Sequence, residues 1–476
     1  MPTYFPKYFT QIAIAVYLIA LLTVSVLYIN YAMIWYWWVF GIVEVIGFFY
    51  FSNYLTREWS RMSESAFRRS VFNLAFIIRL VVMLFLYWFF NTMNGQPFMF
   101  AAKDAIGYHE VAQDFAHMLR EGNFRGIWYS QQGVSDLGYP MYLSIIYFLT
   151  DNSIIAARLL KVVLSSLTCL LIYRIAQRNF GEYVARMSAI FCLLMPNLIY
   201  YCGVHLKETE MTFLLMAFAE RADYVIHKEK YEIGSFLAAI ALGVSLFFFR
   251  TVLGAVAMFA FVSALIFTNQ RVASLGRRWL MLIAVAVVAL YFIGGRIYNE
   301  METYWDQRET NQEIRLEDRS KKGNILARNA GAAIFAPIIF TLPFPTMVET
   351  ENQETARLVH GGNVVKNIMS GLLLFAFAMM IISGWKRGNI FQGEWRDCIF
   401  IIALLVAYLG ILALSAFAHA ERFHMPAIPL EMLFAAVGVS KMTSERYRRY
   451  FTLWCMIMVV AFIAWNWFKL RGRGYA

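Results

Sequence analysis

Residues 12–29 read IAIAVYLIALLTVSVLYI and contain no charged side chain. A helix of roughly 20 apolar residues is long enough to cross the hydrocarbon core of a bilayer. Similar uncharged runs occur at 280–293, 399–417 and 456–467. Over all 476 residues the chain is 60% hydrophobic and 15% charged, whereas soluble domains average about 45–50% apolar and about 25% charged residues. The sequence therefore predicts an all-α polytopic membrane protein.

By the length criterion the chain holds about thirteen candidate spanning helices. We expect them at 12–29, 33–51, 71–90, 154–173, 184–201, 209–225, 233–249, 251–267, 280–297, 364–385, 399–417, 426–439 and 451–468.

Two long polar segments, 91–137 and 298–363, separate the predicted spans. The first contains a stretch, 108–119, whose apolar residues recur at helical spacing, which predicts an amphipathic helix. We expect both segments to form outer-face loops that carry amphipathic or interfacial helices. The expected organisation is two spanning helices in 1–53, a larger membrane core in 54–468 and a basic tail in 469–476.

Lysine and arginine gather in alternate short loops, and such residues favour the cytoplasmic side of a membrane. This bias places both long polar segments on the outer face, and Lys469, Arg471 and Arg473 also fall outside, against the rule. With no signal of another compartment, we expect a bacterial plasma (inner) membrane and a site that faces the periplasm or exterior. The basic loop residues are Arg57, Arg61, Arg68, Arg69, Arg174, Arg178, Lys228, Lys230, Arg271, Arg277, Arg278, Lys386, Arg387, Arg396, Arg446, Arg448 and Arg449.

The net charge of +11 and the pI of about 9.3 are explained by these loops. No basic stripe or recognition motif accompanies the charge, so nucleic acid is not an expected partner. The five cysteines form no CxxC pair, so the sequence predicts neither a metal site nor a redox site. Buried apolar packing is their expected role.

Charged side chains inside the predicted spans are few, with Glu44 and Arg79 as the cases we single out. For both we favour a pairing with a neighbouring helix or snorkelling. A transporter should hold charges near the middle of the bilayer, whereas here the polar residues concentrate at the outer ends of helices. This distribution favours an enzyme that works at the outer interface.

Asp104 lies in the first outer segment, just before Tyr108 and His109. A carboxylate at membrane level can act as the general base that takes a proton from an acceptor hydroxyl. The structural alternative is a helix N-cap, since Asp is a preferred capping residue four positions before Tyr108. Composition alone leaves both roles open, with the cap preferred.

Three further polar groups are predicted on the same side of the membrane. The first group follows the predicted span 184–201 and comprises His205, Lys207, Glu208 and Glu210. A lysine there can bind phosphate as a point charge. Arg250 stands alone between two apolar runs and needs an anionic partner, either a lipid phosphate or a neighbouring carboxylate. The last group precedes a late span and comprises His419, Glu421, Arg422 and His424.

At these residues the chain resembles the GT-C membrane glycosyltransferases, in the branch of the protein O-mannosyltransferases and the lipid A aminoarabinose transferase. Four stretches carry the resemblance in the family order. They are DAIGYHEVA at 104–112; GYPMY at 138–142 followed by ARL at 157–159; PNLIYY at 196–201 leading to Lys207-Glu208; and ERFHMPAIP at 421–429.

The resemblance implies a polyprenyl-phosphate-linked sugar as donor and a catalytic aspartate in the first outer loop, which corresponds to Asp104. We take Glu208 as the second catalytic candidate, and an unknown glycan, lipid or protein as the acceptor. The resemblance implies no soluble cofactor and leaves metal dependence open. The expected donor-phosphate ligands are Lys207, Arg250 and Arg422, and the expected substrate-binding residues are Tyr108, His109, His205, Glu421 and His424.

The chain departs from the mannosyltransferases in two respects. They carry Asp-Glu where this chain has Asp104-Ala105, and here the catalytic loop follows the third predicted span rather than the first. Two additional helices in 1–53 would explain the shift. Two other functions stay open: a polysaccharide polymerase or O-antigen ligase-like enzyme, whose chemistry would suit the 298–363 segment, and a lipid or solute transporter.

Overall fold

The computed structural model describes residues 4–128, 130, 133–228, 232–267, 302, 343–351, 353–386, 398–414, 421–442 and 445–471. Over these residues the protein is a bundle of α-helices, and the fold class predicted from the sequence is confirmed. The predicted span 280–297 and most of the predicted outer segment 298–363 lie outside the described residues.

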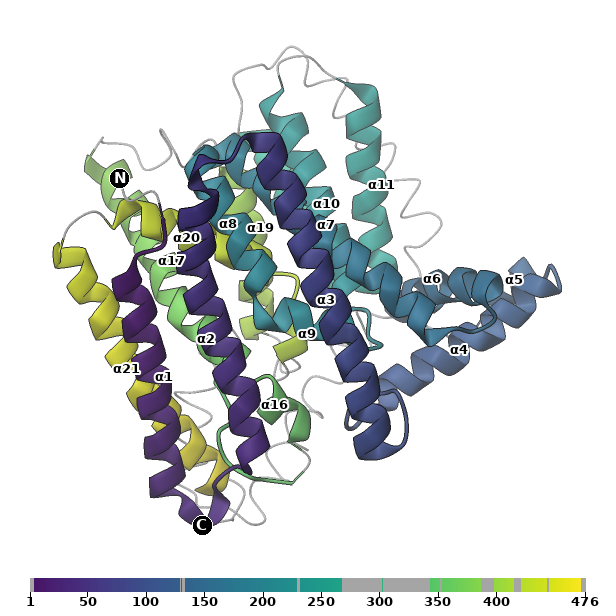
Figure 1. The fold of residues 1–476 in the computed structure, drawn as a ribbon. Helices are drawn as coiled ribbons and strands as arrows, with labels where there is room; N and C mark the ends of the chain where they lie inside the picture. Colours follow the sequence, from purple (N-terminus) through teal and green to yellow (C-terminus); the bar gives the residue numbers. More distant parts are fainter. Residues whose placement is uncertain are drawn as a thin grey trace.

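Most of the helices run along the length of the bundle, whereas α4, α5 and α6 extend from one flank of it (Figure 1). The elements are α1 (Lys7–Leu27), η1 (Ile29–Tyr31), α2 (Trp35–Glu58), η2 (Trp59–Arg61), α3 (Glu64–Asn94), α4 (Lys103–Arg120), α5 (Phe124–Trp128), α6 (Val134–Thr150), α7 (Ile154–Phe180), α8 (Glu182–Leu194), α9 (Pro196–Gly203), α10 (Glu208–His227), α11 (Ile233–Phe249), α12 (Thr251–Phe267), α16 (Glu354–Leu358), α17 (His360–Lys386), α19 (Ile399–Leu414), η5 (Glu421–His424), α20 (Ile428–Lys441) and α21 (Glu445–Arg471).

Six of the described helices are long and apolar enough to cross a membrane, or seven if the bent pair α8–α9 forms one span. The count of thirteen predicted from the sequence is therefore not confirmed. The predicted span 209–225 corresponds to α10, which carries the charged residues Glu220 and Asp223 and is not among the six. The predicted span 426–439 corresponds to α20, which has only 14 residues. The six spans are Lys7–Leu27, Trp35–Arg61, Glu64–Asn94, Ile154–Phe180, His360–Ser383 and Tyr447–Arg471.

The predicted span 184–201 is broken at Pro196, where α8 and α9 meet at a bend of 46°. Proline has no N–H and cannot bond the carbonyl four residues earlier. Arg79 of α3 is fully buried and donates to the carbonyl oxygens of Cys192 and Leu193, at 3.1 and 3.2 Å. The arginine thereby satisfies backbone groups that the break leaves without partners inside the membrane. The expected pairing of Arg79 with neighbouring helices is confirmed.

Glu44 of α2 joins the N-terminal helices to the rest of the bundle. Its carboxylate accepts the backbone N–H of Gly362, in the first turn of α17, at 2.9 Å. The adjacent His360 ring lies 3.0 Å from the hydroxyl of Tyr17 on α1. A carboxylate at a helix N-terminus meets the exposed N–H groups and the positive end of the helix dipole. Glu44 therefore pairs with a neighbouring helix, as expected, and it does so as the cap of α17.

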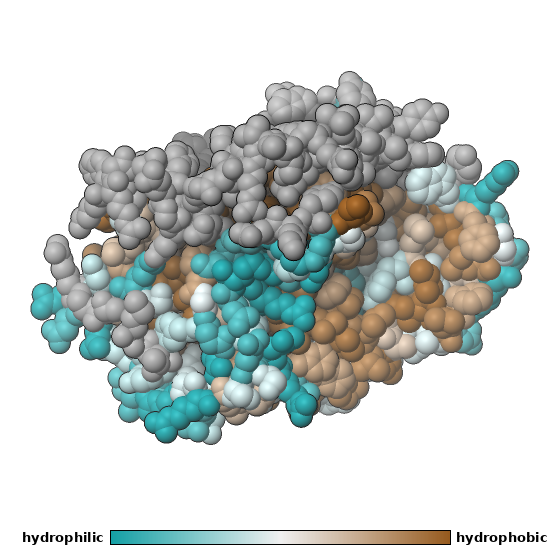
Figure 2. All heavy atoms as spheres, turned by 90° about the horizontal axis from the view of Figure 1, so that it is seen from above, coloured by the Kyte–Doolittle hydropathy of each residue, from teal (hydrophilic) through white to brown (hydrophobic). Residues whose placement is uncertain are grey.

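The basic loops meet at one end of the bundle. Arg186 of α8 donates to the carbonyls of Trp59 and Met62, at 2.8 Å each, and Arg178 of α7 pairs with Asp223 of α10 at 2.5 Å. Viewed toward this end, hydrophilic side chains gather in the middle and hydrophobic ones toward one side (Figure 2). These contacts agree with the prediction that the basic loops share one side.

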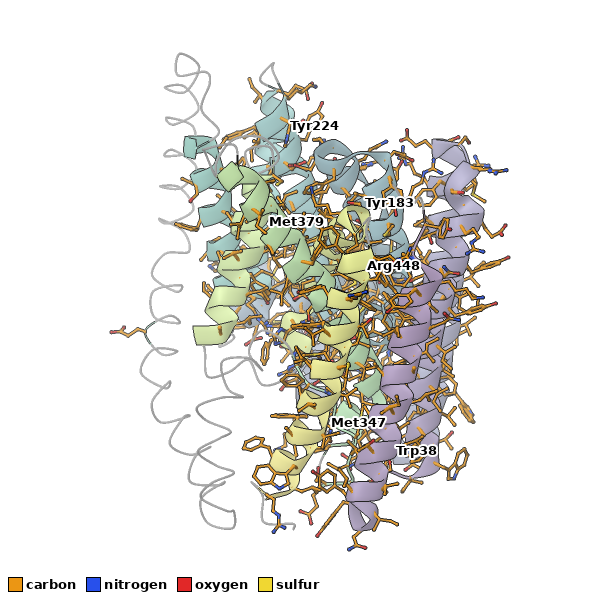
Figure 3. The ribbon with its side chains drawn as sticks, turned by 90° about the vertical axis from the view of Figure 1, so that its left-hand side faces the viewer. Trp38, Tyr183, Tyr224, Met347, Met379 and Arg448 are labelled. Atoms are coloured by element: carbon orange, nitrogen blue, oxygen red, sulfur yellow. The ribbon has the colours of Figure 1, made fainter. Side chains whose placement is uncertain are left out.

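The opposite end holds the connection between α1 and α2 together with the end of α21. Figure 3 shows Tyr183 and Tyr224 toward one end of the bundle and Trp38 and Met347 toward the other. The backbone N–H of Glu349 donates to the carbonyl of Tyr31 at 2.7 Å. Lys469 donates to Thr346 and Gln353, at 2.8 and 2.7 Å. The end of α21 thus lies away from the basic loops, as the sequence predicted for the basic tail.

Candidate active site

Asp104 lies in the first turn of α4, a helix whose N-cap residue is Ala102. The capping alternative for Asp104 is therefore wrong. Its carboxylate oxygen Oδ2 instead accepts a hydrogen bond from Nη1 of Arg422, in η5, at 2.5 Å. The Nε atom of the same guanidinium lies 4.0 Å from the carboxylate of Glu208, which is buried at the start of α10. Two carboxylates from different helices therefore share one arginine.

Lys207 is adjacent to this group and is paired with a residue that the sequence analysis missed. Its ammonium donates to Oδ1 of Asp136 at 2.7 Å and to the carbonyl of Ser135 at 2.8 Å. The Tyr108 hydroxyl donates to the same Asp136 oxygen at 3.0 Å. Burial raises the pKa of Asp136, but Lys207 and Tyr108 outweigh that effect and hold this pKa below its ordinary value. Asp136 therefore carries its negative charge at neutral pH.

Arg250 is the single extended residue between α11 and α12. Its guanidinium lies 4.4 Å from the ring centroid of Phe423, and Arg422 lies 5.1 Å from the same centroid. Gly138 allows α6 to approach this break closely, since a side chain there would meet the carbonyl of Phe248. No carboxylate of the described residues lies within 4.0 Å of Arg250, although its charge lowers the pKa of Asp136.

A buried hydrogen-bonded chain connects α4 to the turn that carries Lys207. The hydroxyl of Tyr147 lies 2.7 Å from Nδ1 of His109 and 3.1 Å from Nε2 of His205. Burial, together with the charges of Arg158 and Lys161, lowers the pKa of His205 well below its ordinary value. His205 is therefore neutral at neutral pH, and the Tyr147 hydroxyl can donate to one imidazole and accept from the other.

Lys161 binds the backbone of the same turn. It is fully buried in α7 and donates to the carbonyls of Val204, at 2.8 Å, and Leu206. Its ammonium also lies 3.5 Å from the carboxylate of Glu210. These contacts fix the backbone immediately before Lys207, so the turn presents that side chain and Glu208 to the site.

The predicted residues are brought together to different degrees. Asp104, Arg250, Arg422 and the adjacent pair Lys207-Glu208 converge from four separate segments. Glu421 borders them, since its carboxylate accepts from the hydroxyl of Tyr201 at 3.5 Å. His424 is fully buried, so the surface it could offer a substrate is small.

Sequence reasoning missed Asp136 and Lys161, and it named Arg158 and Glu210 without giving them a role. His419 lies outside the described residues. Asp136 lies two residues before Gly138 of the GYP motif at 138–140, which was the available signal. Arg158 and Lys161 are charged residues inside a predicted span, which makes them functional candidates by default.

Among the described residues, no group of three or more His, Cys, Asp or Glu side chains is placed to hold a metal ion. The arrangement offers carboxylates for proton transfer and cations for a negatively charged leaving group, all at one end of the bundle.

Two sequence-family models match separate parts of the chain. Residues 137–298 match the model described as dolichyl-phosphate-mannose-protein mannosyltransferase, and residues 354–473 match that of the Alg9-like mannosyltransferase family. No curated protein and no solved structure matches the chain significantly. The first match begins one residue after Asp136, so neither match includes Asp104 or Asp136, whereas the second includes Arg422.

A multi-span helical membrane protein with acids and cations grouped at one end is the class that the fold and the site define. The two matches identify the chain as a membrane glycosyltransferase of the GT-C class. The resemblance stated from the sequence is confirmed at this level, and the chain is an enzyme rather than a transporter.

Proposed function

We propose that this enzyme transfers a sugar from a polyprenyl-phosphate-linked donor to an acceptor hydroxyl at the outer face of a bacterial plasma membrane. One observation carries the proposal: Asp104 and Arg422, on distant segments, form a 2.5 Å contact beside Glu208, Lys207 and Arg250. A carboxylate next to several cations suits a reaction in which a hydroxyl loses its proton while a phosphate leaves.

In the proposed step, the acceptor hydroxyl oxygen attacks the anomeric carbon of the donor sugar. Asp104 takes the hydroxyl proton as the new oxygen–carbon bond forms. The bond between the anomeric carbon and the phosphate oxygen breaks, and its electron pair stays on the polyprenyl phosphate. Glu208 is the second candidate for the base, although its carboxylate is almost completely buried.

The negative charge that develops on the leaving phosphate requires fixed cations nearby. Arg250 is our first candidate, because no described carboxylate pairs with it. Arg422 and Lys207 complete the group, and each of them already holds a carboxylate that a phosphate would compete with. Tyr108, His109, His205, Glu421 and His424 are proposed to bind the sugar or the acceptor, with His205 acting through Tyr147.

The test uses the purified full-length protein in lipid vesicles with radiolabelled polyprenyl-phosphate hexoses and pentoses. Without an acceptor, the expected activity is slow release of sugar to water, and a membrane extract that contains acceptors should accelerate it. The step needs no soluble cofactor, and chelation with EDTA tests whether a divalent metal contributes.

Asp104→Asn serves as the inactive control. A polyprenyl-diphosphate oligosaccharide, offered as a second donor, tests the polymerase or ligase alternative. Turnover of the diphosphate donor alone, unaffected by Asp104→Asn, would replace the proposal with that alternative. If no polyprenyl-linked sugar is consumed by a folded protein, the proposed donor is wrong.

A further inference from the structure

We propose that Asp136 is a positioning residue of the transfer reaction, which keeps the ammonium of Lys207 charged and directed at the donor phosphate. This inference rests on the proposed function, because it assigns Lys207 to the leaving phosphate. Asp136 lies on α6, outside the long spans, and neither family match includes it.

Two hydrogen bonds hold the ammonium group of Lys207 in place. A lysine ammonium has three N–H donors, and two of them bond to Oδ1 of Asp136 and to the carbonyl of Ser135. No acceptor among the described residues takes the third. The ring of Tyr108 lies beneath the ammonium, with its centroid 5.6 Å from Nζ. One donor is thus left for a ligand, on a side chain that cannot swing freely.

The surroundings of Lys207 work against its charge. The residue is only 6% exposed, and burial disfavours the ammonium over the neutral amine. Arg250, from the break between α11 and α12, adds a second positive charge nearby. Together these effects lower the pKa of the Lys207 amine, whereas Asp136 and, more weakly, Glu208 raise it. A lysine that loses its proton can no longer stabilise a leaving phosphate.

The surroundings of Asp136 favour its negative charge, which offsets the effects of burial and of Arg250 on Lys207. Its side chain is 44% exposed, so its ionisation costs less than that of a buried carboxylate. It stands in the first turn of α6, where the helix dipole favours a negative charge. The Tyr108 hydroxyl donates to the oxygen that also holds Lys207, which orients the carboxylate. The charge on Asp136 therefore persists throughout the pH range in which Lys207 would otherwise become neutral.

The experiment compares pH–rate profiles of Asp136→Asn, Lys207→Arg and the double variant with that of the wild-type protein. An opposite charge shifts a neighbouring pKa by about 1–3 units. Asp136→Asn should therefore move the alkaline loss of kcat/KM for the donor by at least about one unit toward acid. On the alkaline side of the profile its rate should fall at least about tenfold below wild type, and most of the rate should be regained as the pH is lowered.

Arginine stays charged throughout this range, so Lys207→Arg should restore the alkaline limb in the Asp136→Asn background. Tyr108→Phe removes a hydrogen bond to Asp136 but leaves the charge. Whatever it does to the rate itself, this variant should leave the pH of the alkaline loss where it is in the wild-type protein. A pH-independent loss in Asp136→Asn that arginine does not rescue would show that Asp136 only supports the fold.

A second readout does not depend on turnover. The pH dependence of Lys207 acylation by acetic anhydride, followed by mass spectrometry, reports the pKa of its amine directly. Asp136→Asn should lower that pKa, and an unchanged pKa overturns the inference. A lowered pKa in a protein that turns over no lipid-linked sugar would instead retain the Asp136–Lys207 relationship and reject the proposed function.

Discussion

The carboxylate of Asp104 and the guanidinium of Arg422 lie 2.5 Å apart although 318 residues separate them in the sequence. The pair joins α4, in the first predicted outer segment, to η5, just before α20. Because an arginine is always charged, this contact places a fixed positive charge against the Asp104 carboxylate while no substrate is bound. A donor phosphate that attracts Arg422 would release the carboxylate toward the acceptor.

Asp104→Asn should give a folded protein that turns over at least about a hundredfold more slowly, since loss of a general base typically costs about 10²–10⁴ in rate. The ion pair is partly exposed and contributes little to stability, so the thermal midpoint should change only slightly. Initial rates and a melting curve check both expectations. Asp114→Asn, at an exposed position of α4, is the matched control. Normal turnover by Asp104→Asn would move the base to Glu208.

Arg250→Ala should raise the KM for the donor, or lower kcat/KM, by roughly ten- to hundredfold, because a hydrogen bond to a charged group contributes about 1.5–3 kcal/mol. Arg250→Lys keeps the charge and should lose less. Steady-state kinetics with varied donor concentration measure the effect. Arg125→Ala, at an exposed position of α5, should behave as wild type. The phosphate site is misplaced if alanine at Arg250, Lys207 and Arg422 in turn leaves turnover unchanged.

Gly41→Ala should destabilise the protein, because the added methyl group would overlap the His360 ring and the Tyr17 hydroxyl. These groups are packed between α1, α2 and α17, and overpacking costs about 1–3 kcal/mol. The measurement is the midpoint of thermal unfolding in detergent. Gly47→Ala, on the same helix, would meet nothing within 4 Å and should stabilise slightly through helix propensity. Equal midpoints for the two variants would contradict the close packing of α2 on α17.

Arg125→Cys, at an exposed position of α5, should react with a membrane-impermeant maleimide in intact cells whose outer layer is permeable, because we place the α4–α6 segment on the outer face. Ser65→Cys, exposed at the start of α3 near the basic loops, should react only after lysis. The native cysteines are all buried, which keeps the background low. The reverse pattern of labelling would invert the proposed orientation.

The sequence predicted the class of fold and the proximity of several candidate residues, for a physical reason. Long apolar runs can satisfy their backbone in a bilayer only as helices, so the fold class followed directly. Polar residues at the ends of such helices must lie at the interface, which grouped Asp104, Lys207 and Arg422 correctly.

What the sequence could not supply was contact between distant segments. Asp136 is one carboxylate at a helix start, a position where acids are common, and only the fold places it beside Lys207. Lys161 binds carbonyls 43 and 45 residues away, a relationship that no periodicity encodes. The proline at position 196 could have indicated the helix break. The hydrogen bonds from Arg79 to the carbonyls beside the break, however, depend on the packing of α3 against α7 and α8.

Glu44 and Gly362, joined by one hydrogen bond, are 318 residues apart, and this separation sets an order of events during synthesis. At about 5–20 residues per second, ribosomes need roughly 16–64 s to make the intervening chain. During that interval α2 waits in the membrane with a carboxylate whose partner does not yet exist, and such a group is costly in hydrocarbon. We therefore expect a membrane chaperone to bind the nascent α1–α2 pair and to dissociate only when α17 has been synthesised.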